Sequence, residues 1–213
     1  MKKEYIWEIN VKNTPLLKRK CNHCNGDRFY CSNKFRMNSQ KRNIDIWLIY
    51  RCTKCDSTYN LTILSRTKPE AIKKDLFLKF SENDEATAWE YAFSSETVRK
   101  NNVELDDHSV EYEIAYDNIS INDILNVEDK AIAFKIKANY KFGLKLSSVI
   151  KTCLGISTNQ FNRMIETDEI YVLQGYSLKK HKVRDGDIVW INKEKLQSIY
   201  KRDNTIDSCK TGD

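Results

Sequence analysis

Four cysteines of this chain form two pairs of the same spacing, Cys21-x-x-Cys24 and Cys52-x-x-Cys55. A Cys-x-x-Cys turn lets two thiolates converge on one side of a tight loop, and a second such turn from a distant strand can complete the tetrahedron that Zn²⁺ prefers. The spacing therefore predicts a structural zinc site. Because four ligands leave no open coordination position, such a site should stabilise the fold rather than hydrolyse a substrate. A thiol redox switch and an iron–sulfur cluster are alternative uses of the same residues.

Strand-like segments surround both cysteine pairs. Apolar residues alternate with polar ones or cluster as β-branched and aromatic residues in four stretches, at Glu4 to Val11, Phe29 to Met37, Ile44 to Tyr50 and Thr58 to Leu64. The loop between the pairs is too long for a short helix-bearing finger, so we expect a zinc ribbon of three or four antiparallel strands. Gly26 follows the first pair and could supply a positive φ there.

Charge is distributed unevenly along the 213 residues, whose net charge is +6. Residues 1–66 carry 14 Lys/Arg against 5 Asp/Glu, residues 67–140 carry 9 against 16, and residues 141–195 carry 10 against 6. The expected division is therefore a basic zinc-ribbon domain (1–66), an acidic α+β spacer (67–140), a basic C-terminal module (141–195) and a polar, flexible tail (196–213). Both basic stretches would suit a polyanion.

Aromatic residues are interleaved with the cations of the basic head. Tyr30, Phe35 and Trp47 lie among Lys34, Arg36 and several further lysines and arginines. Cations neutralise phosphates and aromatic faces stack on unpaired bases, so the mixture suits nucleic acid. A solvated basic sheet whose aromatic residues belong to the core is the equal alternative.

Cysteine usage and hydropathy bear on the compartment. The longest unbroken apolar run, Ile46 to Tyr50, is too short to span a bilayer, and Glu4 and Glu8 do not fit a signal peptide. Seven cysteines, an odd number, favour metal ligands and buried thiols over a disulfide framework. We expect a cytoplasmic protein that has no membrane partner.

Two short helices are predicted near the C-terminus. The first spans roughly Ser147 to Leu154 and ends at Gly155, and the second begins with Ser157 as N-cap and Gln160 three positions later. Strands are expected at Ile170 to Leu173 and at the end of the stretch Val183 to Ile191, on either side of a basic loop. His181 lies in this loop and is expected to join its basic surface.

This order of elements resembles the S4 RNA-binding domain over about 50 residues. Lys145-Leu146 matches the opening of the family's first helix, Ser157 that of its second, and Val183, Gly186 and Asp187 match its terminal Val-x-x-Gly-Asp, whereas Thr158 replaces the usual arginine. The resemblance implies a two-helix plus β module that binds RNA. The cations then available as phosphate contacts are Lys145, Lys151, Arg163, Lys179, Lys180, Lys182 and Arg184. An ordinary charged surface is the alternative for these residues.

The head has a resemblance of its own. Lys34-Phe-Arg-Met-Asn38, the stretch Asp45 to Cys52 and the stretch Cys55 to Asn60 resemble a bacterial family known as domain of unknown function 1062. Members of that family join a cysteine-pair head to an S4-like end. The resemblance implies an architecture for nearly the whole chain and supplies no reaction.

No catalytic motif accompanies these features. Asp106-Asp107-His108 is the only carboxylate–histidine cluster, and a polar turn is its favoured interpretation. We therefore expect an α+β protein that is not an enzyme, holds structural Zn²⁺ and binds structured RNA, such as ribosomal or transfer RNA. The alternatives are a protein–protein adaptor that docks on the ribosome or RNA polymerase, and a thiol/zinc redox sensor.

Overall fold

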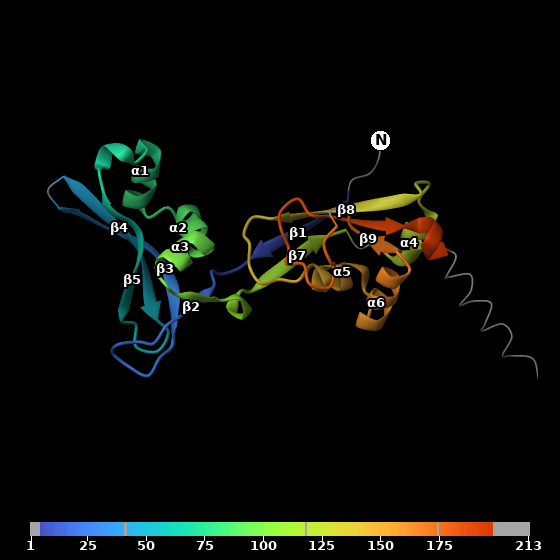
Figure 1. Cartoon of the computed structure of the whole chain (residues 1–213), viewed down its shortest axis with the longest axis horizontal. Helices are drawn as coiled ribbons and strands as arrows, with labels where there is room; N and C mark the ends of the chain where they lie inside the picture. The colour runs from blue at the N-terminus through green and yellow to red at the C-terminus, as the bar shows by residue number, and fades with distance from the viewer. Residues whose placement is uncertain (1–4, 41, 118, 174, 198–213) are drawn as a thin grey trace, which may run out of the picture. The chain divides into compact units, whose positions relative to one another are not determined.

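The computed structural model describes residues 5–40, 42–117, 119–173 and 175–197, and the chain forms two compact units (Figure 1). One unit consists of residues 11–112, and the other joins residues 1–10 to the chain from residue 113 onward. The expected boundaries after residues 66 and 140 do not coincide with this division, because each sheet takes strands from distant parts of the sequence. Except for residues 196 and 197, the predicted tail lies outside the described residues.

The unit of residues 11–112 contains a five-stranded antiparallel sheet of order β5-β4-β3-β2-β6. Its strands are β2 (Leu16–Lys18), β3 (Arg28–Gln40), β4 (Asn43–Cys52), β5 (Thr58–Thr67) and β6 (Glu104–Asp106). The three long strands form two successive hairpins, as expected, and the short strands β2 and β6 extend the sheet beyond them. A bulge between Cys31 and Lys34 interrupts the pairing of β3 with β4.

Helices cover one face of this sheet. They are α1 (Lys74–Glu82), α2 (Glu85–Ala92) and α3 (Ser95–Lys100), preceded by the 3₁₀ turn η1 (Pro69–Ala71). The core beneath them includes Leu48, Leu61 and Phe80, each at most 1% exposed. Helix α3 is separate from α2 because Ser94 caps a new helix, its side chain accepting a hydrogen bond from Thr97 N–H.

The other unit contains a five-stranded sheet of order β7-β1-β8-β10-β9. Its strands are β1 (Tyr5–Val11), β7 (Tyr112–Tyr116), β8 (Ala131–Ala138), β9 (Ile170–Tyr171) and β10 (Ile188–Asn192), and its helices are α4 (Ile121–Asn126), α5 (Leu146–Leu154) and α6 (Thr158–Glu166). Alternate residues of β8 are buried, so one face of the sheet carries the core. No helix among the described residues is long and apolar enough to cross a membrane.

The strand expected over Glu4 to Val11 corresponds to β1, but its place differs from the prediction. It lies parallel to β8 rather than in the cysteine-bearing sheet, and the Trp7 ring stacks on Phe134 with centroids 4.5 Å apart. Trp7 and Ile9 are both buried in this sheet. The cysteine-bearing unit therefore begins after residue 10, and the acidic middle of the sequence is divided between the two units.

Candidate functional site

Two tight turns present the paired cysteines at one end of the sheet in residues 11–112. Cys21 and Cys24 lie between β2 and β3, whereas Cys52 ends β4 and Cys55 lies in the turn to β5. The first turn is closed by Cys21 N–H, which donates to the Gly26 carbonyl (2.8 Å). The second is closed by Cys52 N–H, which donates to the Ser57 carbonyl (2.9 Å). The antiparallel pairing of β3 with β4 brings the two turns together.

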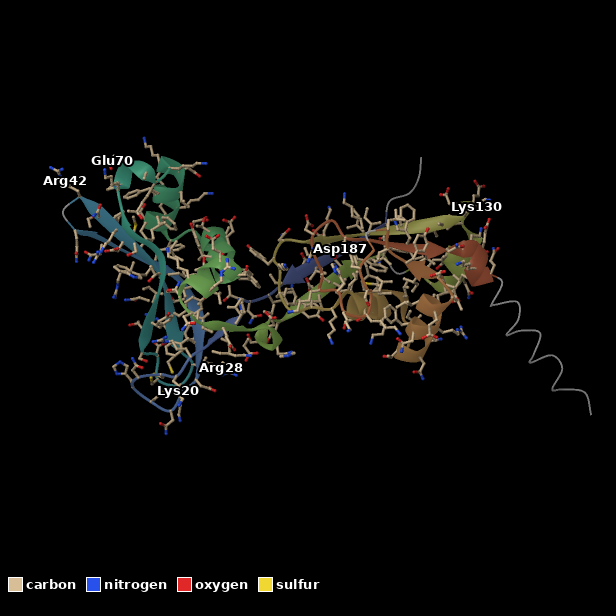
Figure 2. The ribbon with its side chains drawn as sticks, in the orientation of Figure 1. Lys20, Arg28, Arg42, Glu70, Lys130 and Asp187 are labelled. Carbon is tan, nitrogen blue, oxygen red and sulfur yellow. The ribbon has the colours of Figure 1, made fainter. Side chains whose placement is uncertain are left out.

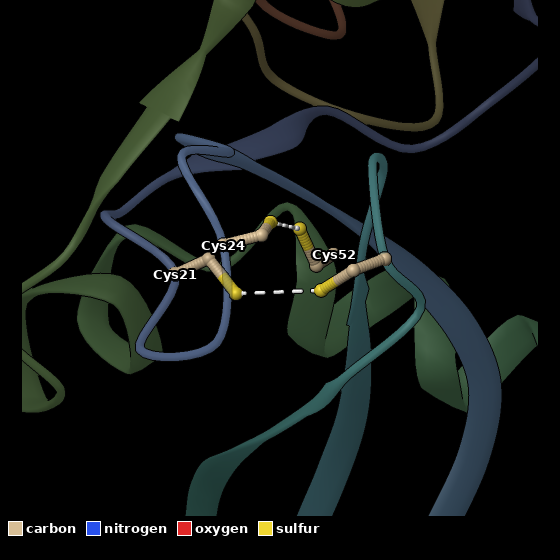
Figure 3. Close-up of side chains that lie close together, drawn as sticks. Cys21, Cys24 and Cys52 are labelled. Atoms are coloured by element: carbon tan, nitrogen blue, oxygen red, sulfur yellow. Dashed lines mark hydrogen bonds between the residues drawn. The ribbon is translucent and has the colours of Figure 1, made fainter.

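The four sulfur atoms converge as the spacing predicts (Figure 3). Cys21 Sγ lies 3.6 Å from Cys55 Sγ, Cys24 Sγ lies 3.7 Å from Cys52 Sγ, and all four atoms are within 4.8 Å of one another. Thiolates bound at about 2.3 Å to one tetrahedral ion would be about 3.8 Å apart. The four side chains therefore fit a single metal ion, to which each turn would contribute two thiolate ligands.

Backbone N–H groups point at three of these sulfurs. Gly26 N–H donates to Cys24 Sγ (3.2 Å), His23 N–H to Cys21 Sγ (3.4 Å) and Lys54 N–H to Cys52 Sγ (3.5 Å). Each donor lies two residues after its cysteine, the arrangement by which a turn offsets part of the negative charge of a thiolate. His23 is exposed and takes part through its backbone.

Gly26 is required for a reason other than the one expected. Gly26 is not among the described glycines with positive φ, so the expected positive φ at this position is wrong. A Cβ at this position would instead lie 2.7 Å from Cys52 Sγ and 3.2 Å from Cys24 Sγ. The absence of a side chain lets the backbone approach two of the four sulfurs.

Ser57 is a neighbour of the cluster that the cysteine spacing does not reveal. Its Oγ lies 3.1 Å from Cys21 Sγ and 3.2 Å from Cys55 Sγ. The Ser57 hydroxyl, followed by the His23 N–H, lowers the pKa of Cys21 to about 6, and the same hydroxyl lowers the pKa of Cys55. The lowered pKa values favour the thiolate forms of Cys21 and Cys55, and the thiolate is the form of cysteine that binds a metal ion.

Cys24 behaves differently in the thiol cluster without metal. The Gly26 N–H favours its thiolate, but the neighbouring Cys55, burial, and the neighbouring Cys52 and Cys21 together raise the pKa of Cys24 to about 12. Four adjacent thiols cannot all ionise unless a cation offsets their charge. Metal binding at this cluster therefore has to release protons.

Two further described cysteines lie outside the cluster. Burial raises the pKa of Cys31 to about 11 and that of Cys153 to about 12, so both thiols are protonated at neutral pH. Among the described residues, the four predicted ligands form the only group of three or more His, Cys, Asp or Glu side chains close enough together to hold a metal ion. Asp106 of the Asp106-Asp107-His108 stretch pairs instead with Arg28 at 2.9 Å.

The basic loop between β9 and β10 carries four of the predicted phosphate contacts, Lys179, Lys180, Lys182 and Arg184, all of them exposed. Two backbone hydrogen bonds join this loop to the start of α5, from Leu146 N–H to the His181 carbonyl and from Val183 N–H to the Leu144 carbonyl (both 2.9 Å). Lys145 and Lys182 form a β-bridge there. Lys145 thus lies beside the basic loop.

The remaining two cations sit on the helices. Lys151, in the last turn of α5, donates to Thr158 Oγ1 (3.0 Å), and Arg163 is exposed in the last turn of α6. Lys179 Nζ lies 3.8 Å from a Glu166 oxygen, which links the loop to the end of α6. The predicted capping box of Ser157 with Gln160 and the C-cap Gly155 are both confirmed.

A network of buried polar side chains joins the two ends of the basic loop. His181 Nε2 lies 2.8 Å from Asp187 Oδ2, and the two side chains are 7% and 8% exposed. Tyr176 donates to Asp187 Oδ1 (3.1 Å), Arg184 N–H donates to Asp187 Oδ2 (2.8 Å), and the Tyr176 and His181 rings stack with centroids 3.6 Å apart. The expectation that His181 would join the basic surface was wrong. The only signal in the sequence for this contact is that Asp187 follows His181 by six residues, on the far side of the turn at Gly186.

The chain was compared with protein families, with curated proteins and with solved structures. Neither the curated proteins nor the solved structures yield a match. The family model described as "Protein of unknown function (DUF1062)" matches residues 37–175, well over half of the chain, from the hairpin of β3 and β4 to the start of the basic loop. The chain therefore belongs to the DUF1062 family.

Proposed function

We propose that this protein binds structured RNA through an S4-like module formed by α5, α6 and the basic loop, and that a structural Zn²⁺ stabilises its cysteine-bearing unit. The observation that carries the RNA proposal is that hydrogen bonds fix the backbone of the basic loop. Hydrogen bonds to residues 144 and 146 place Lys145 beside Lys182, while the Asp187 network fixes the loop interior. Cations held on a rigid backbone can match the phosphate positions of a folded RNA.

The order of elements supports the S4-like interpretation. Two short helices are followed by a strand, a basic loop, a turn at Gly186 with φ +80° and a last strand. Thr158, which replaces the usual arginine of that family, receives a hydrogen bond from Lys151, so a cation lies close to this position. Recognition would then rest on phosphates and on the shape of the RNA.

Zinc is the ion that we propose for the four thiolates, in a ribbon built on β3, β4 and β5. A closed tetrahedral set of soft sulfur ligands is the usual donor set of structural Zn²⁺. Metal analysis of the purified protein should give about one zinc per chain and no visible absorption. A coloured, iron-containing protein would contradict this assignment.

Binding of ribosomal and transfer RNA to the full chain tests the RNA proposal. Replacing Lys179, Lys180 and Lys182 by glutamate should weaken binding by at least tenfold, whereas the same charge change at exposed Lys68, Lys73 and Lys74 should have little effect. With about four phosphate contacts, log K should fall with log[salt] at a slope near −3. A flat salt response, or equal losses in both triple variants, would exclude the loop as the binding surface.

Two outcomes would favour the alternatives. Co-purification with the ribosome or RNA polymerase that survives nuclease treatment would indicate an adaptor. Oxidant-driven metal release, with disulfides inside both cysteine pairs, would indicate a redox sensor.

A further inference from the structure

The sheet of residues 11–112 has one covered face and one face on which no described helix packs. On the covered face, the row Phe35, Leu48 and Leu61 lies under the helices, and the Phe35 ring contacts Phe80 with centroids 4.9 Å apart. Successive side chains of a strand point to opposite faces. The residues that alternate with this row therefore form the other face, which we call the outer face.

Three cross-strand rows define the outer face. They are Tyr30, Arg51 and Thr58; Lys34, Ile49 and Asn60; and Arg36, Trp47 and Thr62. Phe35, which the sequence placed with Tyr30 and Trp47 as a stacking residue, belongs to the core instead. Arg51, which the sequence did not single out, takes part.

The composition of the outer face fits a polyanion. Its three rows contain three cations and no carboxylate. Lys34 and Arg36 are exposed and form no ion pair or side-chain hydrogen bond with any described residue. The nearest acids lie at its two ends, where Asp56 pairs with Arg51 and accepts from Tyr30 Oη (2.7 Å), and Asp45 accepts from Arg66 N–H (2.7 Å).

Aromatic rings provide the second element of recognition. Tyr30 is 39% exposed, Trp47 is partly exposed, and Arg36 lies directly opposite Trp47 in the register. Trp47 and Arg51 are four residues apart on β4, so the rows that contain Trp47 and Tyr30 are separated by about 14 Å. The two rings would thus meet different nucleotides of one strand.

We propose that the outer face binds an unpaired stretch of RNA, with bases stacked on Trp47 and Tyr30 and phosphates held by Lys34 and Arg36. Base pairing hides the faces of bases in a duplex, whereas an open sheet with exposed rings and cations stacks single strands. Figure 2 labels two further exposed or partly exposed cations, Lys20 at the cysteine end of the sheet and Arg42 at its opposite end. A strand laid along β4 would pass from one basic end to the other.

The inference rests on the proposed RNA-binding function but concerns a different unit from the basic loop. The two can therefore fail separately. Loss of structured-RNA binding in the lysine-loop variant tests the loop, while single-strand binding by variants of the outer face tests this inference.

Fluorescence anisotropy with the full zinc-loaded chain provides the test, with a labelled 12-nucleotide oligo(rA) as probe and a 12-base-pair RNA duplex as comparison. The double variant Lys34→Glu and Arg36→Glu should lose at least tenfold in oligo(rA) affinity. Trp47→Leu, which changes no charge, should lose about tenfold for oligo(rA) and leave duplex binding unchanged. Lys73→Glu with Lys74→Glu, exposed in the same unit, is the matched control and should stay within about twofold.

Three results would overturn the inference. They are an intact chain that does not bind oligo(rA), a Trp47→Leu variant that binds it normally, and a control variant that loses as much affinity as the double variant. Thermal melting should show that each variant is folded, and Arg36→Gln, a milder change, should give an intermediate loss. Photocrosslinking of a 5-bromouridine oligonucleotide should label Trp47 or Tyr30, and labelling confined to the C-terminal loop would contradict the proposal.

Discussion

His181 Nε2 lies 2.8 Å from Asp187 Oδ2, and both side chains are almost fully withdrawn from solvent although four exposed cations share their loop. Asp187 also accepts from Tyr176 Oη and Arg184 N–H. A buried carboxylate with three donors closes the chain between residues 176 and 187 into one ordered loop. The positions of the surrounding lysines therefore depend on a carboxylate that is almost fully buried.

Replacing Asp187 by asparagine should lower the free energy of unfolding by about 2 kcal/mol, because the charge-assisted hydrogen bonds to the His181 ring and the Arg184 N–H are weakened in a buried site. RNA affinity should fall as well, although no cation is removed. Urea denaturation and RNA titration measure the two effects. Tyr176→Phe is the control, since it removes one hydrogen bond and keeps the aromatic ring; it should cost only about 1 kcal/mol. Wild-type RNA affinity in Asp187→Asn would show that the network does not position the loop.

Ser57→Ala should weaken metal binding without removing a ligand. The Ser57 hydroxyl lies within 3.2 Å of Cys21 Sγ and Cys55 Sγ. Loss of a hydrogen-bonding neighbour of the ligand atoms commonly costs on the order of tenfold in metal affinity. Competition with a chromophoric chelator measures the change. Thr53→Ala removes a hydroxyl from the same turn that bonds the Arg28 carbonyl rather than a sulfur, so its metal affinity should equal that of the wild type. Equal metal affinities in the wild type, Ser57→Ala and Thr53→Ala would show that the Ser57 hydroxyl does not contribute to metal binding.

Gly26→Ala should disturb the metal cluster through contact rather than through backbone strain. The new Cβ would lie 2.7 Å from Cys52 Sγ, a distance that forces either the sulfur or the turn to move. We expect at least tenfold weaker metal binding by chelator competition. Gly155→Ala provides the contrast: its Cβ meets nothing within 4 Å, but its φ is +63°, so it should cost about 1 kcal/mol of stability and leave metal affinity intact. Tight metal binding by Gly26→Ala would show that the turn adapts.

The features that the sequence predicted are those encoded locally. The capping box of Ser157 and Gln160 and the C-cap Gly155 depend on residues within one turn, and the structure has both. The convergence of the cysteines was also predictable, because a Cys-x-x-Cys turn carries its geometry in its spacing. The alternation over Thr58 to Leu64 predicted the strand period of β5 and thereby which of its residues share a face, and the β-branched and aromatic residues of Ile44 to Tyr50 predicted β4.

Pairing partners and buried neighbours were not predictable in the same way. A period of two indicates that residues 5–11 form a strand, but it does not say that Trp7 will lie against Phe134 in a parallel pair. Phe35 and Trp47 are both aromatic strand residues near cations, and only the register assigns one to the core and the other to the outer face. His181 was misassigned for the same reason, since its lysine neighbours are exposed while its own ring is buried against Asp187.

The ion pair of Arg28 with Asp106 should make the cysteine-bearing unit sensitive to acid. Arg28 Nε lies 2.9 Å from Asp106 Oδ2 and joins β3 to β6 across the short strand β2. The Arg28 guanidinium holds the pKa of Asp106 below its ordinary value, so the stabilisation is fully present above about pH 4 and is lost as pH falls through the lowered pKa. Asp106→Asn should therefore lower the urea midpoint at pH 7, and the difference from the wild type should shrink below about pH 4. Glu104→Gln, an exposed change on the same strand, should leave the midpoint unchanged at both pH values. A difference between Asp106→Asn and wild type that persists undiminished at pH 2 would show that the side chain acts through packing rather than through its charge.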